Sequence, residues 1–162
     1  MFIRFITTGG TIDKIYFDEL SQFEVGESQM EHILREGLVQ FDWDVVPLMK
    51  KDSLAVTDKD RQILRDYIAN DDAMHYVITH GTDTMPETAE VLMGLDDRTI
   101  VLTGALTPAR FRTTDAVFNV GMAVASVQTL GPGVYIAMSG QVFAAGKVRK
   151  NRKENRFEPK SL

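Results

Sequence analysis

Short apolar runs alternate along the chain with segments that have helical periodicity. The apolar runs have the length of buried strands and lie at 2–7, 43–49, 75–79, 99–103 and 133–138. The helical segments lie between them, at 28–38, 57–70, 84–95 and 114–129. A chain in which strands and helices alternate with short links favours a parallel sheet with helices on both faces. The expected fold class is therefore α/β, a three-layer sandwich with a mostly parallel central sheet in a single domain.

Local signals place the ends of several elements. Ser28 is a candidate amino-terminal cap for the first helical segment, and Gly37 lies near its end. Thr57 precedes Asp60 at the spacing of a capping box, which indicates the start of the second helix. Pro47 cannot donate a backbone hydrogen bond, so its strand is expected to lie at a sheet edge or to end there.

Two glycine-containing loops follow predicted strands. TTGGTID, residues 7–13, comes after the first strand, and HGTDT, residues 80–84, comes after the third. Ligands of parallel sheets bind beyond the carboxyl ends of the strands, so both loops are candidate parts of a site. The glycine pair fits neither the dinucleotide fingerprint GxGxxG nor the phosphate loop GxxxxGK followed by Ser or Thr. Taken alone, the first loop is compatible with a plain turn or with a turn that approaches a ligand.

The second loop favours chemistry. Thr82 stands next to the carboxylate of Asp83, and Pro86 with Glu87 marks a helix start whose backbone N–H groups should face the same cleft. A threonine hydroxyl is a poor nucleophile unless a base takes its proton. A lysine whose pKa is lowered by desolvation, oriented by a carboxylate, can be that base. The pattern therefore points to a Thr-Lys-Asp relay whose lysine comes from another strand end.

These two loops carry a family resemblance. TTGGTID and THGTDTM are similar to the two signature segments of bacterial-type L-asparaginases and of their glutaminase and amidotransferase-subunit relatives. The resemblance implies that Thr11 is the nucleophile that attacks the side-chain amide carbon. It also implies that Thr82 and Asp83 are the second threonine and its aspartate, and that this aspartate binds the α-amino group of the substrate.

The resemblance extends to three further segments. Lys150 falls where relatives carry the relay lysine, with Lys147 and Lys153 as the alternatives if the register shifts. Ser53, in DSLAVTD, matches the serine that holds the substrate's α-carboxylate. Ala105, in LTGALTP, matches a loop whose backbone N–H stabilises the oxyanion, a contribution of about 3 kcal/mol. The residues expected to contact the substrate are Gly10, Asp52, Ser53, Gly81, Thr82, Asp83 and Ala105.

The chain departs from the family pattern in the loop that follows the first signature. Relatives carry a tyrosine in a Tyr-x-Val-Gly setting, whereas this chain has Phe23-Glu24-Val25-Gly26. Tyr16 is the tyrosine of this loop, and it is expected to supply the catalytic hydroxyl unless it only packs. Residues 12–27 are expected to close as a lid over the bound amino acid and to exclude water.

Length is the second departure. Typical relatives continue into a second domain that completes the site of a neighbouring subunit, so this chain resembles the amino-terminal half of a relative. We expect residues 1–162 to be an asparaginase amino-terminal-type catalytic domain without the usual second domain, completed by another copy of itself. The other possibility is that catalysis has been lost.

Composition narrows the chemistry. The chain has 162 residues and no cysteine, so it has no disulfide, thiol nucleophile or thiolate metal site. No metal or cofactor is expected: His32 and His75 are read as surface or packing residues, and His80 as a residue that fixes its loop. No apolar run approaches the roughly 20 residues of a membrane span, and the amino terminus lacks a signal-peptide pattern. The expected location is the cytoplasm, with no membrane partner.

The net charge of −5 hides a basic segment at 147–160. Seven basic residues against Glu154 and Glu158 give this segment +5, which leaves −10 for the rest of the chain. Such a segment is either a nucleic-acid-binding tail or a solvated face that balances the acidic body. Phe157 is its only aromatic residue, so no nucleic-acid partner is expected.

These features together predict a single flavodoxin-like α/β domain that hydrolyses L-asparagine to L-aspartate and ammonia through Thr11. The expected partner is this small-molecule substrate. The apolar segment 116–127, which contains Gly121, suits a core helix or a subunit contact, and a homo-oligomer (dimer or tetramer) is expected. The alternative is a non-catalytic amino-acid-binding or interaction module on the same fold. The preference between asparagine and glutamine depends on pocket walls that the sequence does not define.

Overall fold

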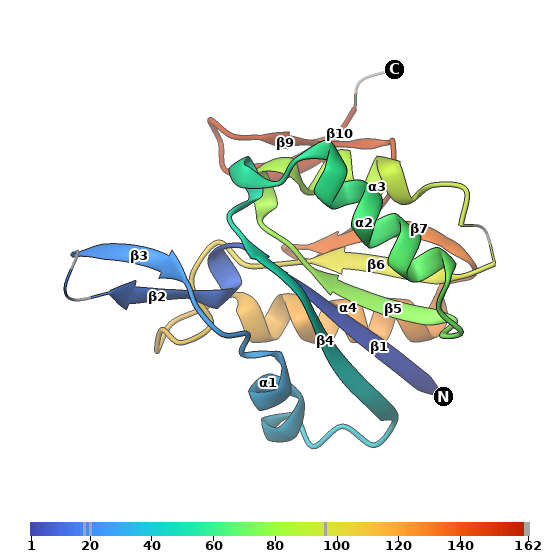
Figure 1. The fold of residues 1–162 in the computed structure, drawn as a ribbon, viewed down its shortest axis with the longest axis horizontal. Helices are drawn as coiled ribbons and strands as arrows, with labels where there is room; N and C mark the ends of the chain where they lie inside the picture. Colours follow the sequence, from blue (N-terminus) through green and yellow to red (C-terminus); the bar gives the residue numbers. More distant parts are fainter. Residues whose placement is uncertain (18, 20, 96, 161–162) are drawn as a thin grey trace.

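A six-stranded sheet forms the centre of the protein, in the order β4-β1-β5-β6-β7-β8 (Figure 1). The computed structural model describes residues 1–17, 19, 21–95 and 97–160. The strands, in sheet order, are β4 (Asp42–Lys51), β1 (Phe2–Gly9), β5 (His75–Thr79), β6 (Thr99–Thr103), β7 (Gly133–Met138) and β8 (Gln141–Ala144). The first five run parallel to their neighbours, and β8 pairs antiparallel with β7. The predicted α/β fold with a mostly parallel sheet is confirmed.

Helices cover both faces of this sheet. Helices α2 (Asp58–Ala69) and α3 (Met85–Leu92) pack on one face, and α1 (Met30–Glu36) and α4 (Ala116–Thr129) pack on the other (Figure 1). Side chains alternate along β5: Tyr76 and Ile78 join the core under α2 and α3, whereas Val77 joins the core under α1 and α4. The continuous apolar runs of the sequence arise because the central strands are buried on both sides. None of the helices in the described ranges is long and apolar enough to cross a membrane.

The strand order identifies the flavodoxin-like topology. In chain order the parallel strands are β1, β4, β5, β6 and β7, and in the sheet the second of them lies outside the first. The chain therefore moves outward in one direction after β1 and in the other direction after β4. The point where this direction changes, between β1 and β5, is where doubly wound sheets leave a crevice beyond their carboxyl ends. The two predicted threonine loops follow these two strands.

Most predicted boundaries agree with the structure, and two need correction. The edge position of the strand with Pro47 and the capping box of Thr57 with Asp60 are both present. The first helix begins at Met30, one residue after the cap position Gln29. Ser28 is therefore not the cap, although its hydroxyl oxygen accepts a bond of 3.2 Å from the Met30 backbone N–H. The helix predicted at 84–95 ends at Leu92, before Gly94 with its φ of 88°.

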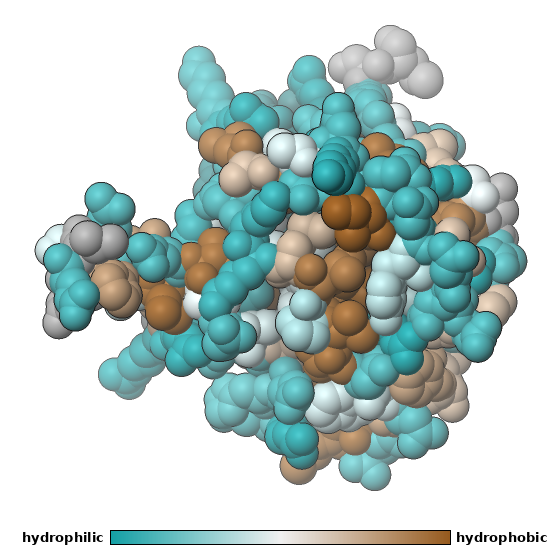
Figure 2. Space-filling view, viewed as in Figure 1, coloured by the Kyte–Doolittle hydropathy of each residue, from teal (hydrophilic) through white to brown (hydrophobic). Residues whose placement is uncertain are grey.

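Two hairpins were not predicted from the sequence. The first, β2 (Lys14–Phe17) with β3 (Gln22–Val25), lies in the segment expected to act as a lid and projects from the body (Figures 1 and 2). Residues 18 and 20 of that expected lid lie outside the described residues. The second, β9 (Val148–Asn151) with β10 (Arg156–Pro159), is formed by the basic segment. The buried side chains of Val148 and Phe157 attach it to the core under α3.

Part of the basic charge of this second hairpin is paired within the protein. Glu158 accepts ion pairs from Arg149 at 2.7 Å and from Arg156 at 3.3 Å. Lys160 pairs with Glu90 of α3 at 2.5 Å. These contacts support the interpretation of the segment as a folded face that balances the acidic body.

Candidate active site

Loops from four neighbouring strands meet at the carboxyl edge of the sheet. Each loop contributes residues that the sequence singled out: Asp52 and Ser53 after β4, Gly10 and Thr11 after β1, Gly81 to Asp83 after β5, and Ala105 after β6. Three of the loops begin with a single 3-10 turn, Thr11–Asp13, Ser53–Ala55 or Thr82–Thr84. Parallel strands deliver all four loops to one edge, which explains why residues far apart in sequence gather there.

Glycines let these loops touch backbone to backbone. A Cβ atom on Gly10 would lie 2.4 Å from the backbone nitrogen of Gly81, and one on Gly81 would lie 2.5 Å from the Cβ of Ser53. A Cβ on Gly104 would lie 2.4 Å from the carbonyl oxygen of His80. Gly10 also has a φ of 88°, a conformation that favours glycine. The glycines therefore make room for neighbouring loops, and the first and second threonine loops are in direct contact.

Thr11 lines an open pocket of about 330 Å³. The other residues of its wall are Lys14, Phe23, Leu106, Thr107, Pro108 and Phe111. The ammonium of Lys14 pairs with the carboxylate of Asp52 at 2.8 Å, so the predicted substrate residue Asp52 is already engaged. Burial alone would raise the pKa of Asp52, but the hydrogen bond from Lys14 and the N–H of Leu54 outweigh it and lower this pKa.

Tyr16 does not line this pocket in the structure. Its side chain is 53% exposed, and its ring packs edge-on against Phe23 with 5.4 Å between the ring centroids. Phe23 in turn packs against Phe111, at 5.8 Å. Phe23 and Phe111 thus form part of the wall of the Thr11 pocket, and Tyr16 contacts Phe23 without being part of that wall.

Lys150 lies against the second threonine. Its Nζ atom donates a hydrogen bond of 3.3 Å to the Oγ1 of Thr82 and one of 2.8 Å to the Oδ1 of Asn155. The same ammonium lies 5.1 Å from the ring centroid of Phe157, directly across the hairpin. Burial lowers the pKa of Lys150, and the charges of Asp83 and Asp115 do not restore it to its usual value. The side chain thus has the environment that a lysine base requires.

The alternative lysines have different surroundings. Lys147 and Lys153 are both exposed, whereas Lys150 is partly buried. The hairpin register places Lys150 opposite Phe157, which is 6% exposed. Side chains alternate between the two faces of a strand. A shift of the β9–β10 pairing by one residue would therefore turn the Lys150 side chain to the opposite face of the hairpin.

A second hollow of about 530 Å³ lies between α3 and β9. Asp83 and Lys150 are part of its wall, together with Pro86, Glu87, Glu90, Val148, Arg149, Asn151, Arg152 and Lys160. Thr11 is part of the wall of the other hollow, and the loop that carries it is in contact with the loop of Thr82. The carbonyl oxygen of Asp83 accepts a bond of 3.2 Å from Arg152, which covers this side.

Asp115 organises the loop that contains Ala105. Its carboxylate accepts hydrogen bonds of 2.9 Å from the backbone N–H groups of Leu106 and Thr107. Asn119 donates to the carbonyl oxygen of Gly104 at 3.0 Å. These bonds hold the loop from the amino-terminal end of α4. Asp115 was not identified from the sequence because the helix was predicted to begin at residue 114, whereas in the structure Asp115 is the residue directly before α4.

Two buried titratable groups lie beside these loops. His80 is 1% exposed, and burial, with a smaller contribution from the charge of Arg61, lowers its pKa to about 4. Asp13 is 2% exposed, and burial raises its pKa to about 6 although its carboxylate accepts a bond of 3.2 Å from the Gln29 N–H. The carbonyl oxygen of Asp13 accepts the Gly26 N–H at 2.7 Å, which closes the base of the first hairpin.

The remaining histidines lie away from these loops, one at the surface and one partly buried, as the reading of them as surface or packing residues predicted. His32 is exposed on α1 and lies 3.3 Å from Glu36, and His75 is partly buried at the start of β5. Within the described ranges, no group of three His, Cys, Asp or Glu side chains is arranged to hold a metal ion.

The strand order and the loops together define a flavodoxin-like α/β domain whose candidate site residues lie at the switch point of the sheet. The chain belongs to the asparaginase family: residues 2–158 match the family model described as "Asparaginase, N-terminal".

Named relatives agree with this assignment. The chain is similar to a glutaminase-asparaginase of Acinetobacter glutaminasificans, with 37% identity over 108 residues, which are 60% of this chain and 32% of that protein. It is also similar to L-asparaginase 2 of Bacillus subtilis (strain 168), with 26% identity over 162 residues, covering 91% of this chain and 43% of that protein.

Solved structures show the same fold. The thermostable L-asparaginase from Thermococcus kodakarensis superposes with a TM-score of 0.83 at 23% identity, covering 98% of this chain and 51% of its own. A probable cytoplasmic L-asparaginase from Campylobacter jejuni superposes with a TM-score of 0.74 at 29% identity, covering 91% of this chain and 49% of its own. The chain thus spans about a third to a half of the length of these relatives.

The contact between the first two loops can be tested by Gly10→Ala. The new methyl group would meet the Gly81 backbone at 2.4 Å in a strained conformation, so we expect a loss of roughly 2–5 kcal/mol in the free energy of unfolding. Gly140→Ala is the matched control, because Gly140 has a similar φ of 83° but no atom within 4 Å. It should cost only about 1–2 kcal/mol. Equal losses in denaturant unfolding of the two variants would contradict the proposed close contact.

The burial of Asp13 predicts a pH-dependent effect of Asp13→Asn. The raised pKa means that Asp13 stabilises the fold below its unfolded pKa of 3.8, and this contribution is lost as the pH rises through about 6. Relative to the wild type, the variant should therefore gain roughly 2–3 kcal/mol between pH 4 and pH 7. Chemical unfolding of both proteins across this range measures the difference. A difference that does not change with pH would show that Asp13 is not buried as described.

Proposed function

We propose that the protein hydrolyses L-asparagine to L-aspartate and ammonia, with Thr11 as the nucleophile. One observation carries the proposal: the partly buried ammonium of Lys150 is hydrogen-bonded to the hydroxyl of Thr82, beside Asp83, on a loop that contacts the loop of Thr11. The names of the similar proteins, glutaminase-asparaginase and L-asparaginase, support an amide as the substrate.

The proposed reaction has two steps. In the first step the Thr11 oxygen bonds to the carbon of the side-chain amide, and ammonia leaves with a proton from the site. In the second step water attacks the resulting ester, which releases aspartate and returns the proton to Thr11. Lys150 in its neutral form can take a proton from the Thr82 hydroxyl at 3.3 Å, and Asp83 orients this pair by its charge.

Other residues are proposed to hold the substrate. Ser53, which is 3% exposed and packed against Gly81, would bind the α-carboxylate, and Asp83 would bind the α-amino group. Asp52, Gly10 and Gly81 would form the remaining wall. The N–H of Ala105 would stabilise the oxyanion, because Asp115 already binds the next two N–H groups of that loop.

The role proposed for Tyr16 requires movement of the first hairpin. Tyr16 packs against Phe23 outside the Thr11 pocket, so it could accept the Thr11 proton only after the hairpin has closed over the substrate. A water molecule is the other proposed proton carrier. Tyr16→Phe separates these routes, since a variant with unchanged turnover leaves only packing to Tyr16.

We also propose that the working form is a homo-oligomer in which a second copy covers α4. Val117 and Phe118 are 54% and 63% exposed on this helix, and Gly121 has no atom within 4 Å of the place of a Cβ. Helix α4 begins directly after Asp115, which holds the loop of Ala105, so such a contact would lie beside the site. The cytoplasmic location stays a prediction: one similar structure is titled cytoplasmic, and a relative from Haemophilus influenzae is described as periplasmic.

Substitution of Thr11 tests the proposed activity. A coupled ammonia assay with asparagine should show turnover in the wild type and a loss of roughly three orders of magnitude in Thr11→Ala. Thr113→Ala, at an exposed threonine outside the pocket, is the control and should keep full activity. Saturable aspartate binding by the wild type without ammonia release would contradict the enzyme and support the non-catalytic module.

The choice of lysine is tested in the same assay. Lys150→Met should lower kcat by about 10²–10⁴, because general base catalysis contributes that much. Lys147→Met changes an exposed lysine of the same segment and should leave turnover unchanged. The opposite result would move the relay to Lys147 and show that the hairpin register differs from the one described.

Phe118→Glu tests the proposed subunit contact. Sedimentation of the wild type should give a dimer or tetramer, and the variant should give a monomer because its new charge would lie within the interface. Gln128→Glu, at an exposed position near the end of the same helix, should keep the assembly. A monomeric wild type, or an unchanged mass for Phe118→Glu, would contradict the proposal.

A further inference from the structure

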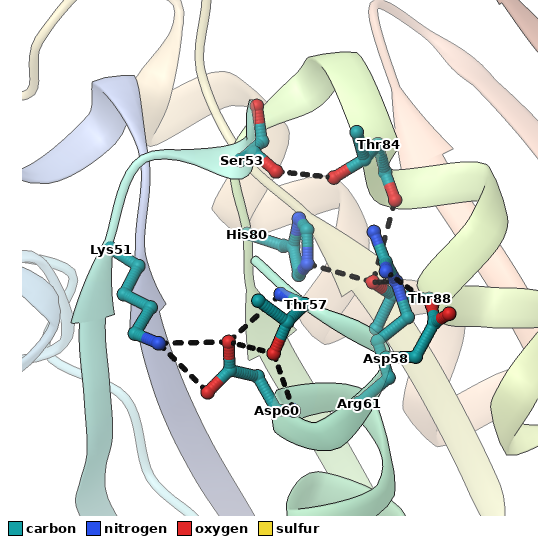
Figure 3. Close-up of polar contacts among 9 residues, drawn as sticks. All are labelled: Lys51, Ser53, Thr57, Asp58, Asp60, Arg61, His80, Thr84 and Thr88. Atoms are coloured by element: carbon teal, nitrogen blue, oxygen red, sulfur yellow. Dashed lines mark hydrogen bonds and ion pairs between the residues drawn. The ribbon is translucent and has the colours of Figure 1, made fainter. Parts of the chain in front are cut away.

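A chain of hydrogen bonds runs through buried side chains beneath the second threonine loop (Figure 3). Arg61 on α2, Thr88 on α3 and His80 after β5 are 7%, 1% and 1% exposed. The Nε of Arg61 lies 3.1 Å from the Oγ1 of Thr88, and this oxygen lies 2.9 Å from the Nε2 of His80. The Nδ1 of His80 lies 2.7 Å from the carbonyl oxygen of Gly81. None of these side chains takes part in the proposed reaction.

The partners determine where the protons lie. A carbonyl oxygen can only accept, so Nδ1 of His80 carries the hydrogen that binds Gly81. The ring is neutral because burial lowers its pKa to about 4, and its Nε2 must therefore accept. Thr88 donates to Nε2 at 2.9 Å in preference to the Thr84 carbonyl oxygen at 3.4 Å. Its oxygen accepts from Arg61, so all the bonds run in one direction, from Arg61 to Gly81.

The end of this chain is the peptide bond between Gly81 and Thr82. The carbonyl and N–H of a trans peptide lie in one plane and point in opposite directions, so a bond to the Gly81 oxygen fixes the plane of that peptide. Thr82 begins its 3-10 turn at this point, and its hydroxyl accepts the bond from Lys150. A rotation of the peptide would move this hydroxyl away from the ammonium.

Burial makes the chain sensitive to the loss of one member. A buried polar group that loses its hydrogen-bonding partner destabilises the groups bonded to it, so each bond supports the next. The guanidinium of Arg61 is anchored at its other end by Asp58, at 3.0 Å, whose side chain is fully exposed and adds little. Arg61 is therefore held mainly by its packing and by Thr88.

We propose that Arg61 and Thr88 are positioning residues for the candidate active site, and that they act through His80 to hold the Thr82 hydroxyl against Lys150. This inference rests on the proposed function for its kinetic consequence, but not for the geometry it describes. It assigns to α2 and α3 a role in the reaction besides their role in the core. Ser53 shares this support, since its carbonyl oxygen accepts a bond of 2.7 Å from Thr84, one turn before Thr88.

Thr88→Val and Thr88→Ser form the test pair. Valine keeps the shape of threonine and removes the hydroxyl, whereas serine keeps the hydroxyl. Arg65→Met is the matched control, because Arg65 joins the same two helices through the carbonyl oxygens of Val91 and Met93, away from the site. Ammonia release from asparagine gives kcat and KM for each variant, and thermal unfolding gives its Tm.

We expect Thr88→Val to lower kcat on the order of tenfold with little change in KM, because misplacement of a reacting group acts on the chemical step. Thr88→Ser should recover most of this loss, and Arg61→Met should resemble Thr88→Val. Arg65→Met should lower Tm with an unchanged kcat. A Thr88→Val variant that keeps its kcat, or a serine variant as slow as the valine variant, would overturn the proposal.

A spectroscopic measurement separates this inference from the proposed function. The imidazole nitrogen signals of His80 should show a protonated Nδ1 in the wild type, and the Nε2 signal should shift in Thr88→Val but not in Arg65→Met. The backbone amide signals of Gly81 and Thr82 should follow the same pattern. If the wild type releases no ammonia, the proposed function fails while these signals still decide the positioning. Unchanged amide signals in Thr88→Val would refute it.

Discussion

The candidate site depends on one steric constraint: neighbouring loops at the carboxyl edge of the sheet touch through glycine. Gly10 leaves room for the backbone of Gly81, and Gly81 leaves room for Ser53. Parallel pairing of β1 with β4 and β5 sets the distance between the strands, and a side chain at either glycine would force the loops apart. The relative positions of Thr11, Ser53 and Thr82 are therefore set by the rigid sheet and not by flexible segments.

Charge is added to this arrangement by the second hairpin. Val148 and Phe157 attach the hairpin to the core. Strand β9, which begins at Val148, also carries Lys150, whose ammonium contacts Thr82. The burial that stabilises this attachment also lowers the pKa of Lys150. Phe157 therefore has two roles: it anchors the hairpin to the core, and its ring lies against the ammonium of Lys150.

The sequence predicted the layers of the fold but not its hairpins. The strands at 75–79 and 99–103 have the predicted boundaries, since they are buried on both faces and read as continuous apolar runs. Each strand of the second hairpin has a single buried anchor, Val148 or Phe157, among charged residues, and such a pattern resembles a solvated tail. The first hairpin packs by aromatic contacts of Tyr16 and Phe23, which no local pattern indicates.

For the site, loop motifs and the family resemblance predicted the threonines, Ser53, Asp83, Ala105 and Lys150, whereas Asp115, Arg61 and Thr88 are recognised only from tertiary contacts. Asp115 binds a loop eight and nine residues away, and Arg61 meets Thr88 across 27 residues, so neither pair has a sequence signature. From the sequence, the glycine pair is compatible with a plain turn or with the approach of a ligand; in the structure it also makes room for the neighbouring loops after β4 and β5. Which residues contact one another across the sheet depends on which strands are adjacent, and the strand order is known only from the folded structure.

The central claim is that Thr11 carries the acyl group, while Thr82 and Lys150, on the neighbouring loop and hairpin, transfer protons. The most direct test is to mix the protein with L-asparagine, quench with acid during the first turnover, and locate the added mass by peptide mass spectrometry. The account predicts an aspartyl ester on the peptide that contains Thr11, formed in the wild type and absent from Thr11→Ala. Release of ammonia with the ester on Thr82, or with no covalent adduct at any time, would contradict it.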